Sequence, residues 1–226
     1  MKQNVVIFGC GGFAREVHQI IEDINAAAGN EVSLNFLGFL DGNTSLHGTE
    51  VHGYPVLGGL EWLDQPHAAP VHISVAVANC ASRKKIVNAI ETGGKAVFLQ
   101  LVHPRAWVGN RVVIGEGTII CAGALVTTDI ELGRHVIINI GATVGHDARI
   151  DDFVTVAPSV NVSGAVLVGP GCDLGTGSAI IQGKTIGAWS VVGAGAVVVK
   201  DVDPNVTVVG SPAKIIKTRQ PGWHQE

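Results

Sequence analysis

The sequence predicts two fold classes in one chain. A small α/β unit covers residues 1–101, a parallel β-helix covers residues 102–203, and a short tail covers residues 204–226. Predicted strands and helices alternate up to Leu101, and beyond it an aliphatic residue recurs at every sixth position. The composition, with 30 glycines and 5% aromatic residues, agrees with a chain that turns at short, regular intervals.

The α/β unit is predicted from four short strands rich in aliphatic residues and from two helical stretches. The second helix is closed by Gly93-Gly94 before the last strand begins. This alternation is typical of a parallel sheet, and the unit is half the size of a full dinucleotide-binding (Rossmann) fold. The predicted strands cover 4–8, 34–40, 72–78 and 96–101, and the predicted helices cover 14–28 and 83–92.

The six-residue repeat runs without interruption through the next part of the chain. Each repeat supplies one short strand and a corner, with the aliphatic residue pointing inward, and glycine or small residues are expected to permit the tight bend. Three repeats close one coil, so residues eighteen apart in sequence lie above one another. Valine, isoleucine or leucine occupies positions 102, 108, 114, 120, 126, 132, 138, 144, 150, 156, 162, 168, 174, 180, 186, 192 and 198, and glycine follows at 109, 115, 133, 145, 169, 175, 187 and 193.

Charge and composition limit the classes of partner. A net charge of −4 and a pI near 6.1 give no basic surface for nucleic acid, so small molecules are favoured. The uncharged stretch 153–171 contains Pro158 and Pro170 and obeys the repeat, so no membrane span is expected. The first apolar run is too short for a signal peptide, and we expect a cytoplasmic protein. The scattered cysteines predict buried reduced thiols, and no metal is expected.

A glycine-rich turn joins the first predicted strand to the first predicted helix. Backbone N–H groups at such a helix N-terminus suit a phosphate, which makes Gly9, Gly11, Gly12 and Phe13 candidate ligand-binding residues. A tight turn with no ligand would use the same residues. Because the unit ends near Leu101, before a second nucleotide-binding half, an NAD enzyme is disfavoured.

His146 is the strongest candidate for acid–base chemistry. It belongs to a row of positions eighteen residues apart, the His146 ladder, in which Gly164 stands one coil further and leaves a backbone N–H and open space beside the imidazole. His146, oriented by Asp147, could act as a general base, and the Gly164 N–H could donate to an oxyanion beside it. The alternative is a histidine on a subunit-contact face. The ladder comprises Asn110, Thr128, His146, Gly164, Gln182 and Lys200.

The repeat, together with the ending Gly210-Ser211-Pro212-Ala213-Lys214, resembles the hexapeptide-repeat acyltransferases. That resemblance implies a left-handed parallel β-helix and a homotrimer. The segment from Ile138 to Asp147 is similar to the catalytic stretch of the family of sialic-acid O-acetyltransferases and bacillosamine-pathway sugar N-acetyltransferases. The glycine-rich start, Gly38 to Asp41 and Val77 to Asn79 continue the same family pattern, so the resemblance extends over residues 4–214.

This family resemblance implies roles for individual residues. The family's general base, its acidic neighbour and the glycine that contacts the thioester carbonyl match His146, Asp147 and Gly164. In two departures, Asp147 stands where some members have the longer glutamate, and Thr155 stands where some have a histidine near the acetyl group. The resemblance further implies acetyl-CoA contacts at Gln182 and Gly210, and acceptor contacts at Gly9, Gly11, Gly12, Phe13, Asp41, Asn79, Arg83 and Asn139.

The activity implied by the resemblance is acetyl-CoA-dependent N-acetylation of a nucleotide-linked amino sugar in glycan biosynthesis, by direct transfer without an acyl-enzyme. O-acetylation of sialic acid or another sugar remains an alternative, and so does a non-catalytic β-helix that binds nucleotides as a scaffold. A serine acetyltransferase fits less well because its N-terminal region is helical. A β-helix carbonic anhydrase would need a spacing of metal-binding histidines that this sequence lacks.

Overall fold

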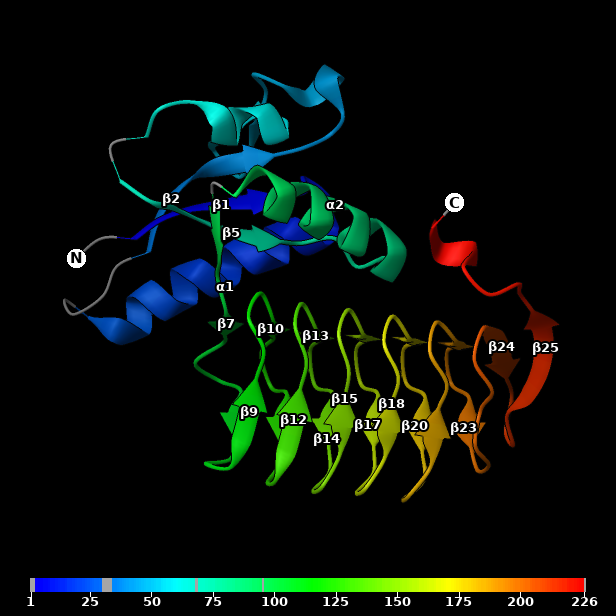
Figure 1. Cartoon of the computed structure of the whole chain (residues 1–226). Coiled ribbons are helices and arrows are strands. Elements are labelled where there is room, and N and C mark those ends of the chain that lie inside the picture. Colours follow the sequence, from blue (N-terminus) through cyan, green and yellow to red (C-terminus); the bar gives the residue numbers. More distant parts are fainter. Residues whose placement is uncertain (1–2, 30–33, 68, 95, 226) are drawn as a thin grey trace. The chain divides into compact units, whose positions relative to one another are not determined.

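The structure is a computed structural model that describes residues 3–29, 34–67, 69–94 and 96–225, and the chain divides into two compact units (Figure 1). The α/β unit consists of Met1–Ala78 and Ser82–Pro104, and the β-helix unit consists of Asn79–Ala81 and Arg105–Glu226. The sequence places the boundary at Leu101. It gives no sign that the three residues 79–81 belong with the β-helix.

The α/β unit is built on a six-stranded sheet of order β3-β4-β2-β1-β5-β6. Its strands are parallel except for β3, which pairs antiparallel with β4. Val5, Val6 and Ile7 in the central strand have no exposed surface, as expected for a parallel strand inside a sheet. The elements are β1 Gln3–Phe8, α1 Gly12–Ala28, β2 Leu34–Leu40, η1 Thr44–Leu46, β3 Glu50–Val51, β4 Tyr54–Gly58, η2 Leu60–Asp64, β5 Val71–Val75, α2 Cys80–Gly93 and β6 Ala96–Phe98.

The β-helix unit has three faces, each a sheet whose neighbouring strands come from successive coils (Figure 1). Paired residues are eighteen apart in the regular coils, as in Thr143 with Asn161, and sixteen apart where β22 pairs with β24. The first face contains β10 Ile119–Ile120, β13 Ile137–Ile138, β16 Thr155–Val156, β19 Asp173–Leu174, β22 Val191–Val192, β24 Val206–Val209 and β25 Lys214–Thr218. The end strand of the same sheet, β7 Leu101–Val102, is counted with the α/β unit. The second contains β8 Trp107–Val108, β11 Leu125–Val126, β14 Thr143–Val144, β17 Asn161–Val162, β20 Ala179–Ile180 and β23 Val197–Val198. The third contains β9 Val112–Ile114, β12 Ile130–Leu132, β15 Arg149–Ile150, β18 Leu167–Val168 and β21 Thr185–Ile186.

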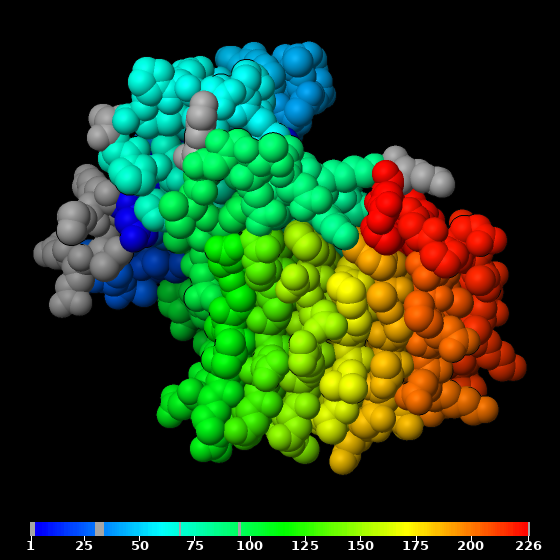
Figure 2. All heavy atoms as spheres, viewed as in Figure 1, coloured from blue at the N-terminus to red at the C-terminus, as the bar shows by residue number. Residues whose placement is uncertain are grey.

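The repeated aliphatic residues form the core of the β-helix. From Ile120 to Val198 each of them is at most 3% exposed, so the inward column predicted from the six-residue repeat is confirmed. Val102, Val108 and Ile114 are only half-buried because they belong to the first coil, at the end of the stack. The stacked coils follow one another in sequence colours from green to orange in Figure 2.

The corners of the coils correct one expectation from the sequence. The bend is made by the third residue after each aliphatic position, which has a positive φ at every corner from Gly117 to Gly195, including Asp147 and Phe153. Glycines directly after the aliphatic residue have no positive φ. They are needed for space, because a Cβ on Gly145 would lie 2.6 Å from the backbone nitrogen of Gly164 in the next coil.

The C-terminal residues close the far end of the β-helix. Strand β25 runs antiparallel to β24, and the short helix η3 (Trp223–Gln225) places the ring of His224 on Trp189, with ring centroids 3.5 Å apart. No described helix is long and apolar enough to cross a membrane. All four cysteines are free, and Cys80, Cys121 and Cys172 are buried as predicted, whereas Cys10 is half-buried.

Candidate active site

His146 and Asp147 occupy the corner between β14 and β15. Adjacent residues in a strand point to opposite sides, but Asp147 has a left-handed backbone, φ +60°, which turns its carboxylate back toward the imidazole. His146 Nδ1 lies 2.7 Å from Asp147 Oδ2. Both side chains are exposed, at 57% and 64%. A neutral imidazole that donates its Nδ1–H to this carboxylate keeps Nε2 as the basic atom.

Gly164 lies directly against the basic side of this imidazole. A Cβ at position 164 would be 2.6 Å from His146 Nε2 and 2.6 Å from Cε1, so any side chain there would displace the ring. The residue has no positive φ, and space is therefore the reason for glycine. Its carbonyl accepts a hydrogen bond from Gly183, and its N–H has no hydrogen-bond partner within the described part of the chain. A basic nitrogen and an available N–H thus occur side by side.

A second carboxylate lies one coil before Asp147 in the same row. Asp129 also has a left-handed backbone, and it accepts hydrogen bonds from Thr128 Oγ1 at 2.9 Å and from Arg111 Nε at 2.8 Å. These two bonds, with a smaller contribution from the charge of His146, lower the pKa of Asp129. Sequence reasoning overlooked Asp129, although the eighteen-residue spacing from Asp147 pointed to it.

The other residues predicted for the β-helix do not all share this corner. Gln182 is exposed and stands two coils beyond His146 on the His146 ladder. Asn139 lies instead between β13 and β14, is 9% exposed, and accepts a hydrogen bond from its neighbour Ile140 at 2.7 Å. Gly210 follows β24, and its carbonyl oxygen accepts a hydrogen bond from the backbone N–H of Val197 in β23. Gly210, like Asn139, therefore lies between the first and second faces. One chain therefore gathers His146, Asp147, Gly164 and Gln182, but not Asn139 or Gly210.

In the α/β unit the glycine-rich turn follows the central strand β1. Gly9 has φ +112°, and a Cβ there would lie 3.0 Å from the carbonyl oxygen of Ala76. Gly11 is the N-cap of α1, with no side-chain cap, and its Cβ position is surrounded by open space. The first N–H groups of α1, from Gly12 and Phe13, therefore lack a side-chain acceptor. This is the arrangement that suits a phosphate.

Asp41 lies next to this turn because β2 is the parallel neighbour of β1. The thiol of Cys10 donates a hydrogen bond to the Asp41 carboxylate; burial first, and then this carboxylate, raise the pKa of Cys10 to about 12. Asp41 Oδ1 also accepts from the backbone N–H of Asn43 at 2.8 Å. The carboxylate is therefore held in place at the edge where the glycine-rich turn lies.

Arg83 and Asn79, which were both predicted to contact the acceptor, differ in their exposure. Arg83 is only 1% exposed, and its Nη1 donates to the carbonyl oxygens of Val77 at 2.7 Å and Ala78 at 2.9 Å. Its guanidinium thus supports the loop after β5. We expected Arg83 to contact the acceptor, but its side chain is buried and is not open to a ligand. Asn79 is exposed and belongs to the β-helix unit.

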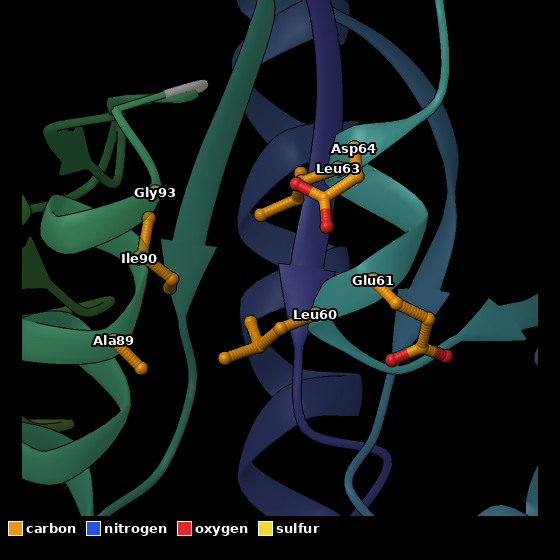
Figure 3. Close-up of a pocket in the computed structure, with 7 residues that line it drawn as sticks. All are labelled: Leu60, Glu61, Leu63, Asp64, Ala89, Ile90 and Gly93. Carbon is orange, nitrogen blue, oxygen red and sulfur yellow. The ribbon is translucent and has the colours of Figure 1, made fainter.

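A separate cavity of about 210 Å³ lies in the α/β unit between η2 and the end of α2 (Figure 3). It contains none of the predicted site residues. The Glu61 carboxylate at its rim accepts a hydrogen bond from the N–H of Gly59 at 2.7 Å, and this bond lowers the pKa of Glu61. The lining residues are Leu60, Glu61, Leu63, Asp64, Ala89, Ile90 and Gly93.

Comparison with known proteins agrees with these observations. Residues 4–90 match the family model described as the PglD N-terminal domain. The chain is 33% identical over 217 residues to a GDP-perosamine N-acetyltransferase from Escherichia coli O157:H7, covering 93% of this chain and 95% of that enzyme.

Two solved structures share the whole architecture. The acetyltransferase domain of PglB from Neisseria gonorrhoeae FA1090 superimposes with a TM-score of 0.83 at 33% identity, covering 95% of this chain and all of that domain. PerB from Caulobacter crescentus, solved in complex with CoA and GDP-perosamine, gives a TM-score of 0.80 at 33% identity, covering 95% and 97% of the two chains. The α/β unit followed by a left-handed parallel β-helix is thus confirmed as the fold class.

Proposed function

Because this chain belongs to the family of sugar N-acetyltransferases, we propose that it transfers the acetyl group of acetyl-CoA to the amine of a nucleotide-linked amino sugar. The similarity to the perosamine enzymes extends over nearly the entire chain. The observation that supports this activity most directly is the His146–Asp147 pair beside the side-chain-free Gly164.

The reaction follows from this geometry. The sugar amine attacks the thioester carbonyl carbon while His146 Nε2 accepts the proton that the amine loses. The carboxylate of Asp147, 2.7 Å from Nδ1, stabilises the imidazolium that forms. The Gly164 N–H donates to the oxyanion of the tetrahedral intermediate. When the C–S bond breaks, the proton on Nε2 passes to the CoA sulfur, and no acyl-enzyme is needed.

The nucleotide part of the acceptor is assigned to the α/β unit. The uncapped N-terminus of α1 at Gly11, Gly12 and Phe13 would donate to the diphosphate. Asp41, held by Cys10 and Asn43, would accept from the base or ribose. Glycine at position 9 keeps the backbone turn tight enough for both groups to lie at one edge of the sheet.

We further propose that the enzyme works as a homotrimer in the cytoplasm. His146 lies at one corner of the β-helix, whereas Asn139 and Gly210 lie toward another. A site that uses all three needs the His146 corner of one copy and the Asn139 corner of its neighbour, with acetyl-CoA in the groove between them. Light scattering of the purified protein tests this assembly, and a monomer with full activity would exclude it.

The activity is tested by measuring CoA release with acetyl-CoA and amino sugars linked to UDP, GDP or dTDP, and with free sialic acid. We expect turnover with at least one nucleotide-linked amino sugar and a loss of about 10³-fold or more in His146→Ala, because a positioned base contributes 10²–10⁴-fold. The variant should keep its fold because the replaced side chain is 57% exposed.

The same assay separates the alternatives. Turnover of sialic acid alone would indicate an O-acetyltransferase. Nucleotide-sugar binding in a thermal-shift panel without any CoA release would indicate a scaffold, since a ligand at a hundred times its Kd stabilises the native state by about 2.7 kcal/mol even without catalysis.

A further inference from the structure

Three residues that follow β5, Asn79–Ala81, belong to the β-helix unit although their sequence neighbours on both sides belong to the α/β unit. Among them Cys80, the first residue of α2, contacts the β-helix. Its Sγ lies 3.4 Å from Thr155 Oγ1 and 3.4 Å from the backbone oxygen of Cys172, which lie in β16 and one coil further on the same face. We call Cys80, Thr155 and the Cys172 carbonyl the Cys80 seat.

The seat is a specific polar contact in a dry environment. Cys80 is 5% exposed, Thr155 is 4% exposed, and Cys172 has no exposed surface. A thiol is a weak donor, but here it lies 3.4 Å from each of two oxygens in a buried environment. The Cys172 thiol is occupied elsewhere, because it donates to the carbonyl of Gly187 at 3.1 Å.

The residues just before Cys80 are held as well. Arg83 donates from one guanidinium nitrogen to the carbonyl oxygens of both Val77 and Ala78. The loop 77–81 is thus fixed on one side of Asn79 by Arg83 and on the other side by the seat. Asn79 is the exposed residue between these two anchors.

We propose that Cys80 is a positioning residue for acceptor binding: by docking on Thr155 and the Cys172 carbonyl it holds the exposed Asn79 where the nucleotide-linked sugar is recognised. The proposal rests on the proposed function for the nature of the acceptor. Loss of the Cys80 thiol weakens acceptor binding and leaves acetyl-CoA binding unchanged, because the His146 corner and Gly164 are not part of the seat and Thr155 itself stays in place.

The test compares the KM of each substrate in Cys80→Ala, Cys80→Ser, Thr155→Val and the double variant Cys80→Ala/Thr155→Val. Loss of one modest hydrogen bond predicts an acceptor KM raised about three- to tenfold in Cys80→Ala, with the KM of acetyl-CoA within about twofold of the parent. Cys80→Ser restores a donor and should recover most of the affinity. The double variant should be no worse than either single variant, because both remove the same contact.

A matched control is Cys121→Ala, which removes another buried cysteine of the β-helix, 2% exposed. It should lower the melting temperature without changing either KM. Equal changes in both KM values, or an acceptor KM in Cys80→Ala that is no higher than in Cys121→Ala, would overturn the proposal.

A second measurement does not depend on turnover. Hydrogen exchange of the amides of residues 79–84 should be faster in Cys80→Ala and Thr155→Val than in the parent or in Cys121→Ala. If the parent shows no acetyl transfer, the proposed function fails, while accelerated exchange still supports the seat. Unchanged exchange would refute the seat whatever the activity.

Discussion

Replacing Gly164 by alanine tests the catalytic corner most sharply. The added Cβ would lie 2.6 Å from His146 Nε2, and an ordinary contact needs about 3.5 Å, so the ring must move by roughly 0.9 Å. The backbone can remain in place because Gly164 has no positive φ. A misplacement of about 1 Å in a catalytic group costs on the order of 10²-fold in rate, or about 2.7 kcal/mol of transition-state stabilisation.

The assay is kcat for CoA release, measured beside the melting temperature. We expect Gly164→Ala to lose about a hundredfold in kcat with little change in stability, because the displaced ring is exposed and can move into solvent. Gly193→Ala is the matched control: its Cβ would lie 2.6 Å from Val209 Cγ1, so it disturbs packing at the same separation without touching His146. Parental kcat in Gly164→Ala, or an equal loss of kcat in the control, would refute the reasoning.

Three further predictions concern single residues. Asp147→Asn keeps a side chain that tolerates the left-handed corner but removes the charge that orients His146. We therefore expect kcat for CoA release to fall by about tenfold or more, with an unchanged melting temperature as the control for folding. Gly9→Ala forces an alanine into φ +112° against the Ala76 carbonyl, and urea unfolding should show a loss of about 1–3 kcal/mol together with a lost thermal shift by nucleotide sugars. His18 is 2% exposed, and burial lowers its pKa below the ordinary 6.5. The unfolded chain therefore binds more protons, so the free energy of unfolding should decrease as the pH falls below 6.5 and should decrease less in His18→Leu; identical pH slopes would contradict this.

Much of the fold could be predicted because one periodic signal determines it. A six-residue repeat with Val, Ile or Leu at each inward position predicts stacked coils that bury them all, and from Ile120 to Val198 these side chains are buried. The left hand of the coils was implied by the family resemblance and not by the repeat. In the α/β unit, strands β3 and β4 were not foreseen. β3 is two residues long and β4 contains Pro55, so neither shows the alternation that predicts a strand.

The candidate site could be predicted where it depends on the eighteen-residue spacing. The same spacing places Gly164 above His146, and it would have located Asp129 below Asp147. Contacts that depend on how a loop folds could not be predicted, because no regular spacing relates their residues. No local sequence pattern indicates that Arg83 bonds to Val77 and Ala78. The same holds for the contact between Cys80 and Thr155.

Strand β25, which runs antiparallel to β24, covers the C-terminal end of the stack of coils. A stack of parallel coils terminates in a row of backbone donors and acceptors that could template another molecule, and such growth leads to fibres. Here β25 pairs with β24 in the opposite direction, and its exposed residues include Lys214 and Lys217. An incoming coil cannot continue the parallel ladder from β24, because β25 already pairs with that edge in the opposite direction. End-to-end stacking by continuation of the parallel coils is therefore disfavoured.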